Sequence, residues 1–277
     1  MGLSTELTGK IYPSATYGVT AEAIRAYAAA TNEDNPAFAG ERPVAPPAFP
    51  IVAASGALWA AMADEELGAN LARLVHFGED HLLHAPIRAG DVLSVESSLE
   101  NVEAGEAGET FTLASRLTNQ DGILAAEVRS LMLIRGSGRR RPRAEAQQGP
   151  PEVLFEVAQR VDEDQAFRYA EASGDRNAVH LDEEAARAAG FPGIILHGMC
   201  TMALAGKAVL DSVCGGDPAR LERITVRFCW PVRPGQTLTT RGWLERVTGE
   251  VATYGFGTLN PAGTPVILGR AEATGRR

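Results

Sequence analysis

The sequence predicts an α+β protein built from two similar halves, each with a helical part followed by an antiparallel sheet. The first observation is an internal repeat. An offset of 142 residues places the segment that begins at Tyr27 over the segment that begins at Tyr169, with a similar pattern of small, polar and turn-forming residues. The second observation is that each half ends in runs of alternating polar and apolar residues, which are typical of half-buried strands. Together they indicate a duplicated domain.

The repeated segment is expected to begin with a helix in each half. Thr20 and Asp162 precede the aligned tyrosines by seven residues, and both are good N-cap residues. Gln165 stands three residues after Asp162, in the spacing of a capping box. The spacing therefore predicts helices that start at these two caps. Three aromatic side chains of these helices are expected in the core, namely Tyr27, Phe167 and Tyr169.

The alternating runs predict three strands in each half. They cover residues 92–102, 109–118 and 123–134 in the first half, and residues 237–247, 251–259 and 265–273 in the second. Turn-forming residues at 119–122 and 260–263 are expected to join the last two strands of each half as hairpins. The two halves therefore predict the same order of elements.

The residues between the halves indicate a linker. Segment 136–151 is rich in Arg, Pro and Gly and has no periodicity. We therefore divide the chain into a first domain (1–135), a linker (136–151) and a second domain (152–277). The arginine cluster in the linker has a second interpretation, which is contact with a phosphate or a partner.

Composition and charge describe an ordinary globular protein. Of the 277 residues, 45% are hydrophobic and 22% charged, and the net charge of −9 argues against a surface that binds nucleic acid. The three cysteines, Cys200, Cys214 and Cys229, form no C-x-x-C pair. This favours a reducing cytoplasm over a disulfide framework or a zinc site. No signal-peptide core or membrane span is recognisable, so we expect a soluble, unexported protein without membrane insertion.

The strongest functional signal is a loop expected after the second repeated helix. Asp175 and His180 are five residues apart, so they would lie on different sides of a regular helix. Gly174 is expected to end the helix, and a following turn would bring the two side chains together. A carboxylate and an imidazole that share a water molecule form an acid–base pair.

A second signal is the apolar segment 194–205, which predicts a buried helix with its N-terminal end near Gly198. Free amide groups at such an end favour a developing oxyanion. The Gly198 N–H is therefore the candidate donor. His197 has two interpretations, lining the site or packing at the helix start.

These residues resemble the hydratase-2 branch of the MaoC-like dehydratase family. The family motif runs aromatic, small residue, Gly-Asp-x-Asn-Pro-aliphatic-His. This chain has Tyr169 followed by Ser-Gly-Asp-Arg-Asn-Ala-Val-His at 173–180. One position departs from the motif, because Ala178 stands where the family usually has Pro. Phe-Pro-Gly at 191–193 and Leu-His-Gly at 196–198 extend the match.

The first half resembles the degenerate partner domain of two-domain members of this family, with an Ala-Pro-Pro-x-Phe segment at 45–49. Glu33 stands opposite Asp175 and Phe38 opposite His180, so the catalytic pair is missing there. We therefore expect one active site per chain. The resemblance implies a double hot-dog fold, in which each of two units wraps an antiparallel sheet around a long helix.

The resemblance also implies a reaction, the reversible hydration of trans-2-enoyl thioesters of CoA or an acyl carrier to (R)-3-hydroxyacyl thioesters. Such a hydro-lyase would use Asp175 and His180 as the acid–base pair. Asn177, His197 and Gly198 would bind the substrate, and no metal or other cofactor would be required. Family habit favours a homodimer. The alternatives are a hot-dog thioesterase and a non-catalytic subunit of a heteromer that binds acyl thioesters.

Other polar residues have competing interpretations. His76, His81 and His84 are expected near the end of the first helical region and lack the ligand pattern of a metal site. They could instead border the acyl pocket. Arg88 and Arg233 stand at equivalent turns, where a solvated turn competes with contact to a pantetheine phosphate.

Overall fold

The structure is a computed structural model that describes residues 2–105, 108–135 and 152–275. In the first half, the elements are β1 (Ile11–Gly18), α1 (Ala21–Ala30), α2 (Pro50–Met62), β2 (Leu74–Leu83), β3 (Val92–Gly105), β4 (Gly108–Thr118) and β5 (Leu124–Arg135). In the second half, they are β6 (Phe155–Arg160), α3 (Gln165–Ser173), α4 (Glu183–Ala188), α5 (Gly198–Val213), β7 (Leu221–Phe228), β8 (Thr237–Thr248), β9 (Val251–Leu259) and β10 (Pro265–Thr274).

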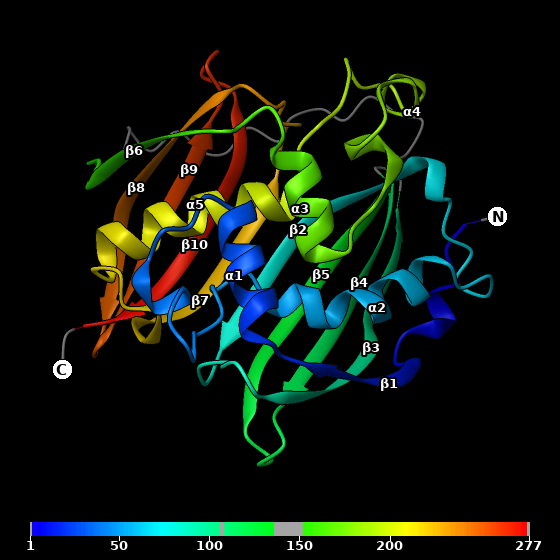
Figure 1. Ribbon diagram of the computed structural model, residues 1–277. Helices are drawn as coiled ribbons and strands as arrows, with labels where there is room; N and C mark the ends of the chain where they lie inside the picture. Colours follow the sequence, from blue (N-terminus) through cyan, green and yellow to red (C-terminus); the bar gives the residue numbers. More distant parts are fainter. Residues whose placement is uncertain (1, 106–107, 136–151, 276–277) are drawn as a thin grey trace.

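One large antiparallel sheet organises the described part of the chain. Its strand order is β1-β3-β4-β5-β2-β7-β10-β9-β8-β6, so each half contributes five neighbouring strands and the halves join where β2 pairs with β7. The sheet curves around the helices, with α2 against the strands of the first half and α5 against those of the second (Figure 1). This arrangement is the double hot-dog fold that the resemblance implied.

The six strands expected from alternating patterns are confirmed, with bounds that differ by at most three residues. Both predicted hairpin turns form, and Gly122 and Gly263 adopt the positive φ that these turns require. Four strands, β1, β2, β6 and β7, were not predicted. The expected position of His76 and His81 near the end of a helical region was therefore wrong, because both lie on β2.

The two helix starts differ in how well they follow the prediction. Thr20 caps α1 as expected and accepts a hydrogen bond from the Ala23 amide at 3.0 Å. The expected start at Asp162 was wrong by two residues, because Asp164 is the N-cap of α3. The Gln165 side chain does accept from the Asp162 amide at 3.0 Å. The Asp162 carboxylate, however, binds other residues instead of capping the helix.

Helices α1 and α3 pack against each other near the middle of the molecule. Tyr27 and Tyr169 are fully buried, as predicted, and their rings meet edge-on with centroids 5.6 Å apart. The expectation that Phe167 lies in the core was wrong, because 45% of it is exposed. On a nine-residue helix with one buried face, Phe167 lies two positions from Tyr169 and so falls on the opposite side.

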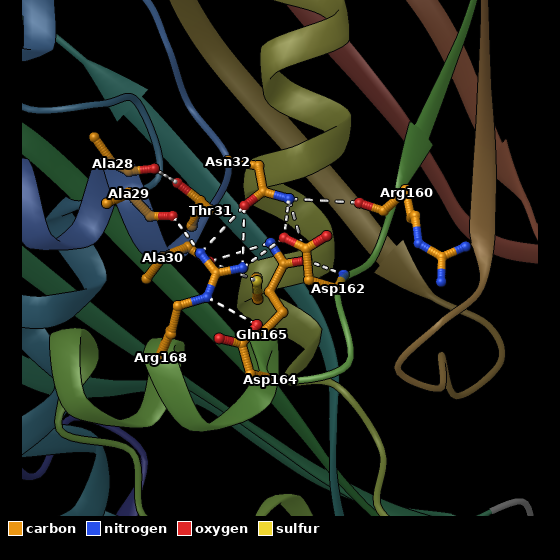
Figure 2. Close-up of polar contacts among 11 residues, drawn as sticks. Ala28, Ala29, Ala30, Thr31, Asn32, Arg160, Asp162, Asp164, Gln165 and Arg168 are labelled. Carbon is orange, nitrogen blue, oxygen red and sulfur yellow. Dashed lines mark hydrogen bonds and ion pairs between the residues drawn. The ribbon is translucent and has the colours of Figure 1, made fainter.

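A polar network joins the end of α1 to the start of α3 (Figure 2). Arg168 donates to the Ala29 carbonyl at 2.7 Å, and Gln165 donates to the Ala30 carbonyl at 3.1 Å. These carbonyls belong to the last turn of α1, where no amide of the helix donates to them. Arg168 also binds Asp162 at 2.6 Å, and Asp162 accepts from Asn32 at 3.0 Å. The network therefore fixes α3, and with it the loop that carries Asp175, against the first half.

Two earlier expectations remain predictions. The linker 136–151 and its arginine cluster lie outside the described residues, so the division into domains 1–135 and 152–277 is untested.

Among the helices that are described, none is both long and apolar enough to cross a membrane.

Replacing Arg168 by Met should lower the free energy of unfolding by about 2 kcal/mol, because the Ala29 carbonyl and the Asp162 carboxylate lose a charged donor. Urea denaturation at neutral pH measures the change. Arg176→Met is the matched control, because the exposed Glu171 is the ion-pair partner of Arg176 among the described residues. It should change stability by less than about 0.5 kcal/mol. Equal effects of the two substitutions would contradict the role assigned to the network.

Candidate active site

The loop after α3 is shaped by its own side chains. Helix α3 ends at Ser173, and Gly174 adopts a left-handed conformation with φ of +78° while its amide donates to the Ala170 carbonyl. The Asn177 amide then donates to Asp175 Oδ1 at 3.1 Å. Asn177 in turn accepts from the Val179 amide and begins the short 3-10 turn η4 (Ala178–His180). These local bonds return the chain so that His180 faces the same region as Asp175.

His180 is buried, with only 9% of the residue exposed, and its tautomer follows from its partner. Its Nδ1 lies 2.8 Å from the Ile195 carbonyl oxygen. Because a carbonyl only accepts, Nδ1 carries the proton and Nε2 of the neutral ring keeps its lone pair. Burial lowers the pKa of His180, although the Asp175 charge and the bond to Ile195 oppose that shift. The ring is therefore a neutral base at physiological pH.

His197 forms the second wall of the site. Its Nε2 donates to the backbone carbonyl of Asp175 at 2.9 Å, and its ring stacks on His180 with centroids 3.8 Å apart. Its Nδ1 is buried and has no hydrogen-bond partner among the described residues. Burial and, next, the neighbouring His180 together lower the pKa of His197 to about 4, against the opposing effect of Asp175. His197 thus combines both earlier interpretations, because it packs at the start of α5 and faces the site.

Asp175, His180 and His197 converge on one point. One ligand atom from each residue lies within 4.8 Å of the others, which is the geometry of three groups around a water molecule or a metal ion. The tautomers assigned above make both free ring nitrogens acceptors, and a carboxylate is also an acceptor. A water molecule offers two donors to such a site.

Gly198 is the first residue of α5, so its amide N–H has no acceptor within the helix. A methyl group at this position would lie 3.3 Å from the ring of Phe228, which explains why a residue without a side chain fits there. Asn177 is exposed, and the role the structure shows for it is to begin η4. Phe228 was not predicted, because nothing in its sequence context distinguishes it from other apolar strand residues.

The equivalent place in the first half is filled. Glu33, opposite Asp175, accepts from Lys207 at 3.3 Å, and Lys207 also binds Asp34 and Asp211. Phe38, opposite His180, is buried. The cavity lined by Glu33 and Lys207 has a volume of about 10 Å³, space for about one water molecule. Glu33 and Asp34 of the first half therefore bind Lys207 and hold α5.

The arginines considered above are exposed and lie in turns. The Arg88 amide donates to Asp91 Oδ2, and the Arg233 amide donates to Gln236 Oε1. These are backbone contacts that shape equivalent turns in the two halves, so they agree with the interpretation as solvated turns.

The fold and this arrangement define a class, double hot-dog proteins with one Asp–His site beside the long helix of the second unit. Residues 146–256 match the family described as "MaoC like domain", and residues 6–128 match the "FAS1-like, dehydratase domain region". The second half of the chain therefore carries a MaoC-like domain, as the sequence motif indicated.

Relatives and solved structures agree with this assignment. The chain is 37% identical over 185 residues to "3-hydroxyacyl-thioester dehydratase Y" of Mycobacterium tuberculosis, and the match covers 63% of each chain. It is 48% identical over 87 residues to "Enoyl-CoA hydratase 2, peroxisomal" of Arabidopsis thaliana, which covers 31% of this chain and 28% of that protein. The matches thus span less than two thirds of these relatives. A MaoC-like dehydratase from Phytophthora capsici superimposes with a TM-score of 0.80 at 25% identity, over 99% of this chain and 98% of that one.

The low pKa of His197 predicts a pH-dependent stability. Protonation is harder in the folded protein than in the unfolded chain, so the stabilisation is complete above pH 6.5 and is lost as the pH falls toward 4. A shift from 6.5 to about 4 corresponds to roughly 3 kcal/mol. Urea denaturation between pH 7 and pH 4 should show a smaller acid loss for His197→Gln than for the wild type. His84→Gln, at an exposed histidine, is the control and should follow the wild type.

Proposed function

We propose that this chain is a hydro-lyase that reversibly hydrates trans-2-enoyl thioesters of CoA or an acyl carrier to (R)-3-hydroxyacyl thioesters. The observation that carries the proposal is the convergence of Asp175, neutral His180 and neutral His197, the last of which is the N-cap of α5 and directly precedes Gly198. The names of the relatives, a 3-hydroxyacyl-thioester dehydratase and an enoyl-CoA hydratase 2, support the same reaction. The (R) configuration follows from the resemblance to the hydratase-2 branch.

The proposed mechanism uses the acceptors of the site to hold a water molecule. As the water oxygen bonds to the β-carbon of the enoyl group, one water proton passes to the pair formed by Asp175 and His180 Nε2. The electron pair of the double bond moves toward the thioester carbonyl, whose oxygen gains negative charge. The Gly198 N–H stabilises that oxygen. The same Asp175–His180 pair then delivers a proton to the α-carbon, so all atoms of water end in the product.

The remaining residues of the proposed site act by position. Asn177 Oδ1 holds η4, which places His180, while the exposed amide nitrogen of Asn177 is available to the water or the thioester. His197 Nδ1, which has no hydrogen-bond partner among the described residues, is a further acceptor of the proposed site. These assignments predict that Asn177 and His197 contribute less to turnover than Asp175 and His180.

We also propose a cytoplasmic location and a homodimer. Cys200, Cys214 and Cys229 are all free, which fits a reducing compartment. Strands β1 and β6 form the two outer edges of the sheet, and unpaired edges of this kind are common places of association.

The central test is the loss of enoyl-thioester absorbance with crotonyl-CoA and with a longer trans-2-enoyl-CoA. Asp175→Asn and His180→Ala should each lower kcat by about 10²–10⁴-fold, with little change in the affinity for the thioester, because they remove proton transfer and not binding. Glu33→Gln changes the equivalent carboxylate of the first half and should keep turnover within a few-fold of the wild type. Full turnover by Asp175→Asn would refute the mechanism.

Metal removal tests whether Asp175, His180 and His197 bind a water molecule directly or through a metal ion. If Asp175, His180 and His197 hold water by hydrogen bonds alone, then turnover after treatment with EDTA and gel filtration should equal that of the untreated protein. Loss of turnover with EDTA and its recovery on adding Zn²⁺ would instead identify a metal-activated water.

A further inference from the structure

A buried polar network lies on β2, away from the site described above. The Glu79 carboxylate is fully buried and contacts two histidines, His76 Nε2 at 2.7 Å and His81 Nε2 at 2.9 Å. His81 is also fully buried, and its Nδ1 lies 3.1 Å from the Pro47 carbonyl oxygen. His76 is partly exposed. The network therefore connects Pro47, in the segment before α2, through His81 and Glu79 to the partly exposed His76.

The hydrogen bonds determine where the protons lie. The Pro47 carbonyl only accepts, so His81 Nδ1 donates to it, and one proton lies between His81 Nε2 and Glu79 Oε1. Both ring nitrogens of His81 are therefore used in hydrogen bonds. Burial by itself would raise the pKa of Glu79, but the bonds from His76 and His81 bring that pKa below its usual value. His76 then donates from Nε2 to Glu79, and this bond fixes the orientation of its ring.

The second half has apolar side chains at the paired positions of the neighbouring strand. Glu79 pairs with Val226 and His81 pairs with Ile224, and both of these partners are buried. A buried ionic network contributes little net stability compared with apolar residues of similar volume. Perturbed, buried ionisable groups of this kind are more common at functional sites than elsewhere. The buried Glu79 and His81 on β2 therefore indicate a role other than stabilising the fold.

The network reaches the candidate active site through one aromatic side chain. The pairing of β2 with β5 is irregular between His76 and Gly78, which allows His76 and Glu79 to meet despite their odd spacing. The His76 ring contacts the ring of Phe228, the last residue of β7, with centroids 5.1 Å apart. Phe228 in turn packs against Gly198. The path thus ends at the amide that would bind the thioester oxygen.

We propose that Glu79 is a positioning residue for the oxyanion donor. It fixes His76, and His76 holds Phe228 against the first turn of α5, so that the Gly198 N–H keeps its place beside Asp175 and His180. The catalytic consequence rests on the proposed function. The structural link from Glu79 to Gly198 does not, and it can be measured separately.

The test replaces the hydrogen-bonded pair Glu79 and His81 by apolar residues of similar volume, as Glu79→Ile with His81→Leu. The double variant should fold, with a melting temperature within a few degrees of the wild type. Its kcat for crotonyl-CoA hydration should fall about tenfold, with KM changed less than about threefold, because the oxyanion donor is displaced while substrate contacts remain. The Gly198 amide resonance in a ¹H–¹⁵N TROSY spectrum should shift in the same variant.

Two further variants make the result specific. Ser97→Ala with Ser115→Ala removes a buried hydroxyl pair at 2.7 Å on β3 and β4, which are separated from β7 by other strands. This control should leave both kcat and the Gly198 resonance unchanged. Phe228→Leu should reproduce the loss of kcat, and adding it to the Glu79/His81 variant should cause no further loss, because both act on the same path.

Each outcome decides the proposal. A folded Glu79/His81 variant with wild-type kcat and an unshifted Gly198 resonance would overturn it, as would a loss that is additive with Phe228→Leu. If the double variant fails to fold, Glu79→Gln is measured by the same two readouts and the same criteria. If the wild type hydrates no enoyl thioester, the proposed function fails, and the Gly198 resonance alone decides whether Glu79 positions the start of α5.

Discussion

The hydrogen bond from His197 Nε2 to the backbone carbonyl of Asp175 is the contact on which the site depends. It joins the loop after α3 to the first turn of α5, two segments that belong to different layers of the fold. It also fixes the tautomer of His197, so that the buried Nδ1 keeps its lone pair as an acceptor. This bond fixes the position of Asp175 relative to Gly198. The stack of His180 on His197 and the polar network between α1 and α3 hold the same loop in place.

Duplication explains how the fold can hold such a site without symmetric chemistry. Both halves place a turn after their first helix, but in the first half Lys207 from α5 binds Glu33, and Phe38 fills the space of the histidine. The first half thus supports the second in two ways, by anchoring α5 through Lys207 and by contributing β2 to the centre of the sheet. The positions of the first half that correspond to Asp175 and His180 therefore stabilise the molecule.

Much of this organisation could be predicted from the sequence, and the failures have physical causes. Alternating strands were recognised because one face is polar, whereas β7 was missed because its alternation is interrupted, and β2 because charged and histidine residues occupy its buried face. Asp175 and His180 were found through the motif of the loop. The role of Phe228 could not be found, since it depends on a contact between β7 and α5 that no local pattern records. The bonds of Glu79 likewise depend on an irregular strand pairing.

The electrostatics of the site suit a reaction that creates negative charge only for a moment. Burial keeps His180 and His197 neutral, so a base is available at physiological pH, and the negative charge that acts on both rings is that of Asp175. A cationic histidine would stabilise the enolate oxygen but could not accept the proton of water. The proposed mechanism separates the two tasks, because lone pairs on Asp175 and His180 would handle protons while the amide at the start of α5 would bind the oxygen. This mechanism requires the start of α5 to stay fixed relative to the loop after α3. The bond from His197 to the Asp175 carbonyl and the close approach of Phe228 to Gly198 hold the two segments in place.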